Sequence, residues 1–253
     1  MSKTVWITGA SSGIGQEFAR HYAKMGCRLI LTARRTDRLE ALAAELGTPC
    51  RILPADLADE ADCTRLCAAL AGENIDIFIN NAGFGVCGSY LETDAAREEE
   101  MIKVNVAAMA RLFHFAVRKM DAEGGGTILN VASSAGLLPG GPYMAGYYAS
   151  KAYVVSLTRG VAEELRENRS PVYVCALCPG PVNTEFNDRA GVVFALKGIT
   201  PEFCVEEALL GMMHHKTVIV PSAFMRLCTG AQKLLPTPLL MPIVARQQKK
   251  KLG

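Results

Sequence analysis

The stretch TVWITGASSGIGQEF, Thr4–Phe18, decides the fold of this 253-residue chain. It begins with a short run of β-prone residues, passes through a glycine-rich turn and continues as a helical pattern. The strand run does not alternate strictly between apolar and polar residues, which is typical of a strand buried on both faces of a parallel sheet. The stretch therefore predicts the first strand and the first helix of an α/β domain.

Outward from this stretch, short apolar runs alternate with helical patterns. Strands are expected at 4–8, 28–33, 50–56, 75–81, 126–133, 171–180 and 217–221. Helices are expected at 13–26, 36–47, 59–72, about 94–120 and from the region 141–154 to about 168. Regular alternation with right-handed crossovers predicts a doubly wound fold with helices on both faces of the sheet. No linker or repeat interrupts the pattern, so we expect a single domain over residues 1–253.

Composition narrows the class of function. Half of the residues are hydrophobic and 21% are charged, as in ordinary globular domains. The net charge of +2 is too balanced to indicate nucleic-acid binding. No signal peptide is recognisable and no apolar run is long enough to cross a bilayer, so we expect a cytoplasmic protein.

Cysteine and histidine give no sign of a metal site. The nine cysteines are spread without a framework, which favours free thiols in a reducing compartment. Cys175 and Cys178 form a C-x-x-C pair, but they lie in an expected strand and no second pair completes a zinc site. We interpret them as packing residues and expect no metal ion.

The turn TGASSGIG, Thr8–Gly15, is the first candidate binding site. Its spacing is Gly9-x3-Gly13-x-Gly15, and glycine lets a backbone turn tightly and approach a ligand closely. The N-terminus of the following helix offers unpaired N–H groups and partial positive charge to a phosphate. Glycine-rich turns occur in many loops, but this one lies at the first strand-to-helix junction, where doubly wound proteins bind nucleotide phosphates.

Three motifs, in this order along the chain, resemble those of the short-chain dehydrogenase/reductase family. They are TGxxxGxG at Thr8–Gly15, NNAG at Asn80–Gly83 and YxxxK at Tyr147–Lys151. The resemblance extends from Thr4 to about Glu185. It implies a three-layer Rossmann fold with a mostly parallel, seven-stranded sheet. It also implies an oxidoreductase that transfers hydride between NAD or NADP and a carbonyl or secondary alcohol.

The resemblance further implies a set of cofactor-binding residues. They are Gly9, Ser11, Ser12, Gly13, Ile14, Gly15, Arg34, Arg35, Asp56, Leu57, Asn81, Ala82, Gly83, Tyr147, Lys151, Pro179, Gly180, Val182 and Thr184. Ala33 occupies the position where the family's NAD enzymes carry an acidic residue for the ribose 2′-hydroxyl. Arg34 follows, and a guanidinium suits a 2′-phosphate. We therefore expect NADP(H) in preference to NAD(H), with two solvated arginines at a strand end as the alternative interpretation.

The stretch GPYMAGYYASKAYV, Gly141–Val154, is the candidate catalytic segment. Residues three or four apart lie on the same face of a helix, so Tyr147 and Tyr148 can both reach Lys151. Helical spacing leaves the choice between the two tyrosines open. A phenol beside a buried ammonium can donate and accept a proton near neutral pH, provided that the pocket is partly dry.

The family pattern resolves that choice and adds two residues. It selects Tyr147 as the general acid and base, with Lys151 lowering the pKa of its phenol. It also selects Ser134, thirteen residues before the tyrosine, rather than the neighbouring Ser133, to hydrogen-bond the developing oxyanion. Asn105 is implied to hold a water molecule that links the lysine to solvent.

The C-terminal third is expected to bind substrate. We expect a lid at about 185–215 and an extension at about 222–253. An apolar pocket is expected from Leu137, Leu138, Tyr143, Phe186, Val193 and Phe194. It suits a hydrophobic ketone, such as a steroid-like ketone, a 3-oxoacyl thioester or a xenobiotic carbonyl. We expect the extension to pack on the domain, to join a partner subunit of a homodimer or homotetramer, or to touch lipid, in that order.

Two other functions compete with this prediction. A non-catalytic, NADP-sensing binding protein has the same fold, but the complete Asn–Ser–Tyr–Lys set argues against it. A sugar-nucleotide epimerase or dehydratase has a different glycine spacing and an additional substrate domain for which this chain is too short.

Overall fold

The computed structural model describes residues 2–185 and 198–249. Its strands are β1 (Thr4–Thr8), β2 (Arg28–Thr32), β3 (Cys50–Ile52), β4 (Ile77–Asn80), β5 (Gly126–Val131), β6 (Val172–Leu177) and β7 (Val218–Ile219). Its regular helices are α1 (Gly13–Lys24), α2 (Thr36–Leu46), α3 (Glu60–Leu70), α4 (Ala95–Ile102), α5 (Met109–Ala122), α6 (Ala145–Glu167), α8 (Pro201–Met213), α9 (Ala223–Ala231) and α10 (Thr237–Lys249). The π-helix η1 (Lys103–Ala108) and the 3₁₀ helices η2 (Ser134–Leu137) and η3 (Gln232–Leu234) connect some of them.

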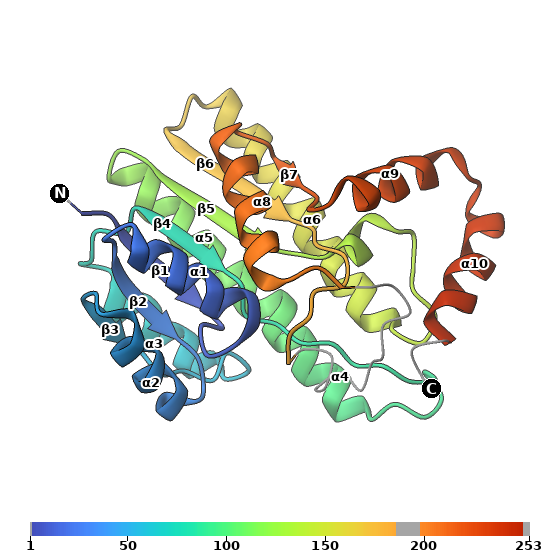
Figure 1. The fold of residues 1–253 in the computed structure, drawn as a ribbon, viewed down its shortest axis with the longest axis horizontal. Helices are drawn as coiled ribbons and strands as arrows, with labels where there is room; N and C mark the ends of the chain where they lie inside the picture. Colours follow the sequence, from blue (N-terminus) through green and yellow to red (C-terminus); the bar gives the residue numbers. More distant parts are fainter. Residues whose placement is uncertain (1, 186–197, 250–253) are drawn as a thin grey trace.

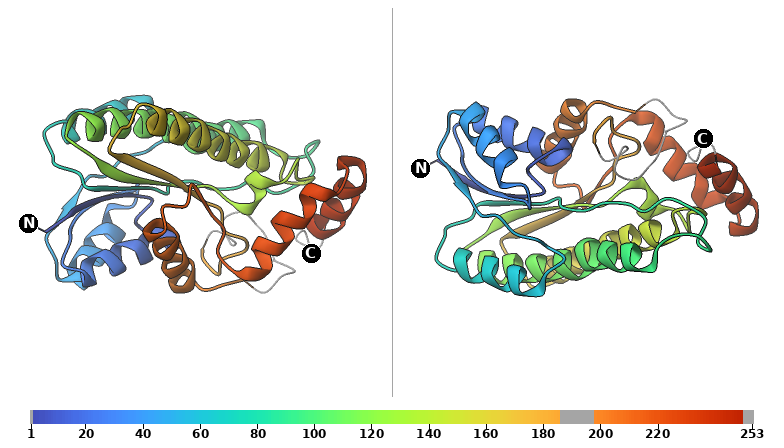
Figure 2. Two further views of the ribbon diagram at one scale, coloured as in Figure 1. Left: turned by 90° about the horizontal axis from the view of Figure 1, so that it is seen from above. Right: turned by 90° about the horizontal axis from the view of Figure 1, so that it is seen from below.

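The strands form one seven-stranded sheet in the order β3-β2-β1-β4-β5-β6-β7, and every pair is parallel. Helices α1, α2 and α8 cover one face, and α3, α5 and α6 cover the other (Figures 1 and 2). The predicted three-layer, doubly wound Rossmann fold is confirmed.

The first strand shows why the sheet is buried on both faces. Trp6 belongs to the core under α3, α5 and α6, whereas its neighbours Val5 and Ile7 belong to the core under α1, α2 and α8. The Trp6 ring stacks on that of Phe78 in the adjacent β4, with ring centroids 3.9 Å apart. The side chains of β1 thus fill an apolar layer on each face of the sheet. Because both faces are apolar, TVWIT does not alternate strictly between apolar and polar residues.

Helix boundaries follow local chemistry. Gly47 ends α2 in a left-handed conformation with φ 62°. Thr36 is the first residue of α2, and Arg35 occupies its cap position. Asp59 and Asp94 cap α3 and α4 by accepting hydrogen bonds from backbone N–H groups of the first turn.

The long helix expected at about 94–120 is divided into three segments. Its middle segment, η1, has π-helical hydrogen bonding, a feature often found at functional sites. The side chain of Asn80 in β4 donates to the carbonyl oxygen of Met109, just after η1, at 3.1 Å, and to Asn130 at 3.0 Å. A buried polar network therefore ties this segment to the centre of the sheet.

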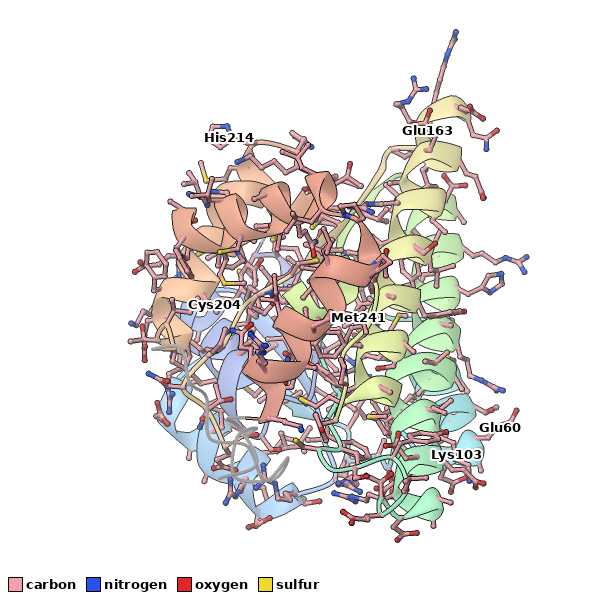
Figure 3. The ribbon with its side chains drawn as sticks, turned by 90° about the vertical axis from the view of Figure 1, so that its right-hand side faces the viewer. Glu60, Lys103, Glu163, Cys204, His214 and Met241 are labelled. Atoms are coloured by element: carbon pink, nitrogen blue, oxygen red, sulfur yellow. The ribbon has the colours of Figure 1, made fainter. Side chains whose placement is uncertain are left out.

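The C-terminal segment lies beside the sheet rather than under it. Helices α9 and α10 extend to one side of the molecule (Figure 1), and Met241 marks α10 in Figure 3. Leu240, Val244 and Gln248 of α10 are buried, so one face of the helix packs on the domain. Among the described residues, no helix is long and apolar enough to span a membrane.

Candidate active site

A pocket of about 320 Å³ opens at the carboxyl ends of the strands, where a doubly wound sheet binds its ligand. Of the predicted residues, its wall contains Gly9, Ser11, Ser12, Gly13, Ile14, Arg34, Arg35, Asp56, Leu57, Asn81, Ala82, Gly83, Ser134, Tyr147, Lys151, Pro179, Gly180, Val182 and Thr184. Gly15 and Asn105 are not part of the wall. The structure therefore brings nearly the whole predicted set together.

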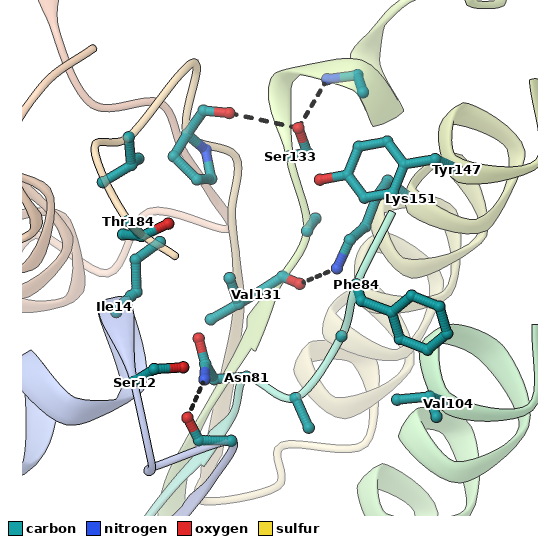
Figure 4. Close-up of a pocket in the computed structure, with 18 of the residues that line it drawn as sticks. Ser12, Ile14, Asn81, Phe84, Val104, Val131, Ser133, Tyr147, Lys151 and Thr184 are labelled. Atoms are coloured by element: carbon teal, nitrogen blue, oxygen red, sulfur yellow. Dashed lines mark hydrogen bonds between the residues drawn. The ribbon is translucent and has the colours of Figure 1, made fainter. Parts of the chain in front are cut away.

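The glycine turn packs closely against the end of β4. A Cβ added to Gly9, which has φ +66°, would lie 2.7 Å from the Asn81 side-chain nitrogen, and one added to Gly15 would lie 2.5 Å from the Gly9 carbonyl oxygen. Asn81 Nδ2 donates to the carbonyl oxygens of Thr8 and Gly9 at 2.9 and 3.3 Å (Figure 4). The glycines are thus required both for the turn and for this close approach.

Two arginines stand at the end of the pocket beside β2. Arg34 forms ion pairs with Glu100 at 3.0 Å and Asp56 at 3.9 Å. Arg35 donates to the Ser11 hydroxyl at 3.1 Å and pairs with Glu185 at 3.3 Å. Hydrogen bonds from Arg38 and Arg35 lower the pKa of the Glu185 carboxyl.

Ala33 in the same region is buried and carries no acidic group. The end of the pocket therefore holds two guanidinium groups and one hydroxyl beside the Asp56 carboxylate. A guanidinium group that exchanges its carboxylate partner can bind an anionic ligand here.

Tyr147 and Lys151 lie one turn apart on α6, and both are more than nine-tenths buried. The Lys151 ammonium donates to the Val131 carbonyl oxygen at 2.9 Å and lies 5.9 Å from the centre of the Tyr147 ring (Figure 4). Burial raises the pKa of Tyr147 to about 12 and lowers that of Lys151 to about 8. The expectation that Lys151 lowers the tyrosine pKa is therefore wrong for this structure: desolvation raises that pKa, and the contribution that lowers it is the hydrogen bond with Ser133.

The serine beside the phenol is Ser133, not the predicted Ser134. The phenol oxygen of Tyr147 points toward the Ser133 hydroxyl (Figure 4), and their hydrogen bond partly offsets the rise in the tyrosine pKa. Ser133 is extended and caps η2, and its hydroxyl accepts from Ala135 N at 3.1 Å. Ser134 lines the pocket wall as the first residue of η2.

Residue counting misplaced this serine because an irregular loop, residues 138–144, separates η2 from α6. A loop can hold one more residue without moving the helix that follows it. Ser133 therefore lies fourteen positions, rather than thirteen, before the tyrosine that it contacts.

Asn105 lies in η1, directly behind the pocket wall. Its side-chain nitrogen donates to the Phe84 carbonyl oxygen at 2.8 Å and to the Ser150 hydroxyl at 3.1 Å, and its oxygen accepts from Phe84 N at 3.0 Å. A Cβ added to Gly83 would lie 2.9 Å from Asn105 Oδ1 and 3.3 Å from Lys151 Nζ. Glycine at position 83 therefore lets the asparagine and the lysine approach the same point.

The pocket wall also includes residues that the sequence analysis did not assign to the site. They are Phe84, Val104, Met144, Tyr148, Met225, Gln247 and Gln248. The spacing of Leu240, Val244 and Gln248 along the C-terminal helix would have placed a glutamine on its buried face, which is the signal that could have found it.

The expected apolar pocket can be followed only in part. Leu138 lines the pocket. Phe186, Val193 and Phe194, together with residues 186–197 of the expected lid, lie outside the described residues. Within residues 2–185 and 198–249, no cluster of three or more potential metal ligands is present.

The family model for short chain dehydrogenase matches residues 3–191, so the chain belongs to the short-chain dehydrogenase family. A serine 3-dehydrogenase from Agrobacterium fabrum is 34% identical over 191 residues, which cover 74% of each chain. Like the relatives it resembles, this chain is an oxidoreductase that acts on alcohol or carbonyl groups.

Two solved structures extend the similarity to nearly the whole chain. A short-chain dehydrogenase from Sphingobium yanoikuyae, in complex with NADPH, has a TM-score of 0.82 and 34% identity, and the match covers 92% of this chain and 94% of that one. A bulky-bulky ketone specific alcohol dehydrogenase from Comamonas testosteroni has a TM-score of 0.78 and 30% identity, covering 92% and 93%.

Proposed function

We propose that the chain is an NADP(H)-dependent oxidoreductase that interconverts a hydrophobic ketone and its secondary alcohol. The observation that carries the proposal is the meeting of the Tyr147 phenol, the Ser133 hydroxyl and the Lys151 ammonium in a buried part of the pocket that also contains the glycine turn. When bound, the nicotinamide cofactor supplies or accepts the hydride.

The residues of the pocket fit a dinucleotide phosphate. Because Gly9 and Gly13 have no Cβ, the backbone of the turn can come close to neighbouring groups. Helix α1 begins at this turn, so its N-terminal N–H groups are available to a phosphate. Arg34 and Arg35, with the Ser11 hydroxyl, would hold the 2′-phosphate that distinguishes NADP(H) from NAD(H). The NADPH complex of the Sphingobium relative supports this preference.

Tyr147 is the proton donor for reduction. With its pKa raised to about 12, the phenol is protonated at neutral pH and can give its proton to the carbonyl oxygen as negative charge develops there. Ser133 stabilises the same oxygen by a hydrogen bond that strengthens in the transition state. In the reverse direction, the phenol must first lose its proton.

Lys151 supplies positive charge beside the phenol. With a pKa lowered to about 8, the ammonium is mostly protonated at pH 7 and stabilises the phenolate left behind by proton transfer. Asn105 approaches the same point beside Gly83, where it would hold a water molecule that returns the proton from solvent.

The substrate is proposed to be a bulky, largely apolar ketone. Apolar side chains of Phe84, Leu138, Met144 and Met225 line the same pocket as the catalytic tyrosine. The similarity to the bulky ketone specific enzyme from Comamonas supports this class.

We propose one domain over residues 1–253, with an extension at about 222–253. The second half of the lid expected at about 185–215 is instead α8, whose Cys204, Val205 and Ala208 are buried in the core of the domain. We also propose a homodimer or homotetramer in the cytoplasm. Exposed apolar residues gather on the extension, and such patches commonly mark interfaces with a protein or a membrane. They are Phe224, Leu227, Leu234, Leu235, Leu239 and Ile243. All nine cysteines are free thiols, which supports a reducing compartment.

The test is NADPH oxidation, followed by absorbance, over a panel of aldehydes, ring ketones and 3-oxoacyl thioesters. We expect turnover with bulky ring ketones and a lower rate when NADH replaces NADPH. NADPH binding without turnover on any carbonyl would instead indicate a cofactor-sensing protein.

A further inference from the structure

The side chain of Gln248 has one unused hydrogen-bonding atom in the wall of the pocket. Gln248 is 3% exposed, and its Nε2 donates to the Tyr148 hydroxyl. Its Oε1 is buried and has no hydrogen-bond partner among the described residues. A buried amide oxygen without a donor is unfavourable, so a ligand that brings a donor to it gains affinity.

The Tyr148 phenol that contacts the Gln248 amide is held in place by its own neighbours. The Tyr148 ring packs against Gly141, where any Cβ would collide with the ring. Burial raises the pKa of the Tyr148 phenol, which therefore stays neutral beside the Gln248 amide. On the same helix, the Lys249 ammonium lies 5.8 Å from the centre of the Tyr143 ring. Two contacts thus hold α10 against α6 and the loop that precedes it.

Few of the described residues that line the pocket are charged, and Lys249, which follows Gln248 on α10, is not part of the wall. The charged side chains among the described lining residues are Arg34, Arg35, Asp56 and Lys151. The first three belong to the end beside β2, and Lys151 belongs to the catalytic group. A carboxylate placed against Gln248 would bring no donor hydrogen to Oε1 and would be buried without a counter-ion. A neutral hydroxyl satisfies the oxygen without burying a charge.

We propose that Gln248 determines substrate specificity by accepting a hydrogen bond from a hydroxyl group of the substrate, on the side away from the reacting carbonyl. This inference rests on the proposed function and narrows its substrate class. The preferred substrate is a neutral, apolar ring ketone, or the matching secondary alcohol, that carries a second hydroxyl. Simple 3-oxoacyl chains, which end in hydrocarbon, lack the donor.

The test uses matched substrates. Each ring ketone is compared in three forms: with a distal hydroxyl, with that hydroxyl methylated, and without it. For the ring ketones that place the hydroxyl correctly, we expect kcat/KM at least about tenfold higher than for the methyl ether, because a site built for a donor rejects analogues that lack it.

In Gln248→Leu, we expect the ratio between hydroxyl and methyl ether to fall close to one, while kcat/KM for the ketone without the hydroxyl stays the same or rises. Arg246→Leu is the matched control, because Arg246 is exposed on the same helix. It should keep the wild-type ratio. Wild-type protein that does not distinguish any hydroxyl from its ether, or a Gln248→Leu variant that distinguishes them as well as wild type, would overturn the inference.

A second measurement separates this inference from the proposed function. In Tyr147→Phe, binding of the hydroxyl ketone and its methyl ether is compared by calorimetry in the presence of NADPH, with and without Gln248→Leu. A preference for the hydroxyl that disappears in the double variant supports the role of Gln248 even if wild-type turnover fails. Equal binding of both compounds overturns it, whether or not the enzyme is active. If Gln248→Leu does not fold, Tyr148→Phe, which removes the partner of Nε2, must lower the same preference.

Discussion

The Ser133 hydroxyl hydrogen-bonds to the Tyr147 phenol, across a loop that separates η2 from α6. The bond keeps the Ser133 hydroxyl close to the Tyr147 phenol. A carbonyl oxygen that the phenol can protonate therefore also lies within hydrogen-bonding reach of Ser133. The bond also distinguishes Ser133 from Ser134, which a count of residues had favoured.

Ser133→Ala should lower kcat by about 10²–10³-fold, the typical loss when one oxyanion donor is removed. Ser134→Ala, measured beside it, should lose less than Ser133→Ala. Steady-state kinetics with a bulky ketone and NADPH would measure both. The reverse order of losses would return the catalytic role to Ser134.

Tyr147→Phe should abolish measurable turnover while NADPH still binds, because the substitution removes only the phenol hydroxyl. General acid–base catalysis contributes about 10²–10⁴-fold, and no other described side chain is placed to replace it. Nucleotide binding is measured by fluorescence titration. Tyr153→Phe, on the exposed side of the same helix, is the control and should keep full activity. Retained turnover in Tyr147→Phe would exclude the proposed acid.

Lys151→Met should be inactive but more stable than wild type at pH 7. The folded-state pKa of Lys151 is lowered to about 8 from 10.5, so the buried ammonium destabilises the folded state below pH 8. Wild-type stability must therefore rise between pH 8 and 10.5, where the unfolded chain holds more protons. The penalty is about 3 kcal/mol, offset in part by the Lys151–Val131 hydrogen bond that the variant loses.

Urea unfolding at pH 7 and pH 9.5 measures this effect. The stability advantage of Lys151→Met should shrink at the higher pH, whereas Lys103→Met, which replaces an exposed lysine, should show no such change. An advantage that is equal at both pH values would mean that Lys151 does not titrate as a buried group.

Arg34→Ala and Arg35→Ala should each raise the dissociation constant for NADPH far more than that for NADH. Only NADPH carries the 2′-phosphate, so the loss of a guanidinium partner acts on it selectively. Isothermal calorimetry with both nucleotides measures the difference. Arg20→Ala, which removes an ion pair with Glu45 on the surface, is the control. Equal effects on the two nucleotides would argue against a phosphate role.

Leu239→Asp combined with Ile243→Asp should convert a dimer or tetramer into a monomer. Both residues are more than half exposed on α10, on the side away from Leu240, Val244 and Gln248. Charged groups there would be expensive to bury in an interface. Light scattering after size-exclusion chromatography gives the mass. An unchanged oligomer mass would place the subunit interface elsewhere. If the wild-type protein binds anionic vesicles and the double variant does not, these residues contact lipid instead.

Much of the fold could be predicted because it depends on local signals. These signals each determine the structure of only a few neighbouring residues. They are the run TVWIT, the glycines of the first turn and the YxxxK spacing. The position of Ser133 depends on the length of a loop, and loop length is weakly constrained by sequence. Gln248 reaches the pocket only because α10 folds back onto the loop before α6, a long-range contact that no local pattern encodes.

The π-helical segment η1 has a consequence for how this site can change. A π-helix arises when one residue is inserted into an α-helix, and removing it restores the regular helix. In this chain, Asn105 is held by a hydrogen bond from Phe84 N, and the Met109 carbonyl oxygen by one from the Asn80 side chain. A deletion within Lys103–Ala108 would change the spacing between these two attached points and would disrupt the hydrogen bonds that depend on it. The position of Asn105 behind the pocket wall therefore depends on the length of this helical segment as well as on the identity of its residues.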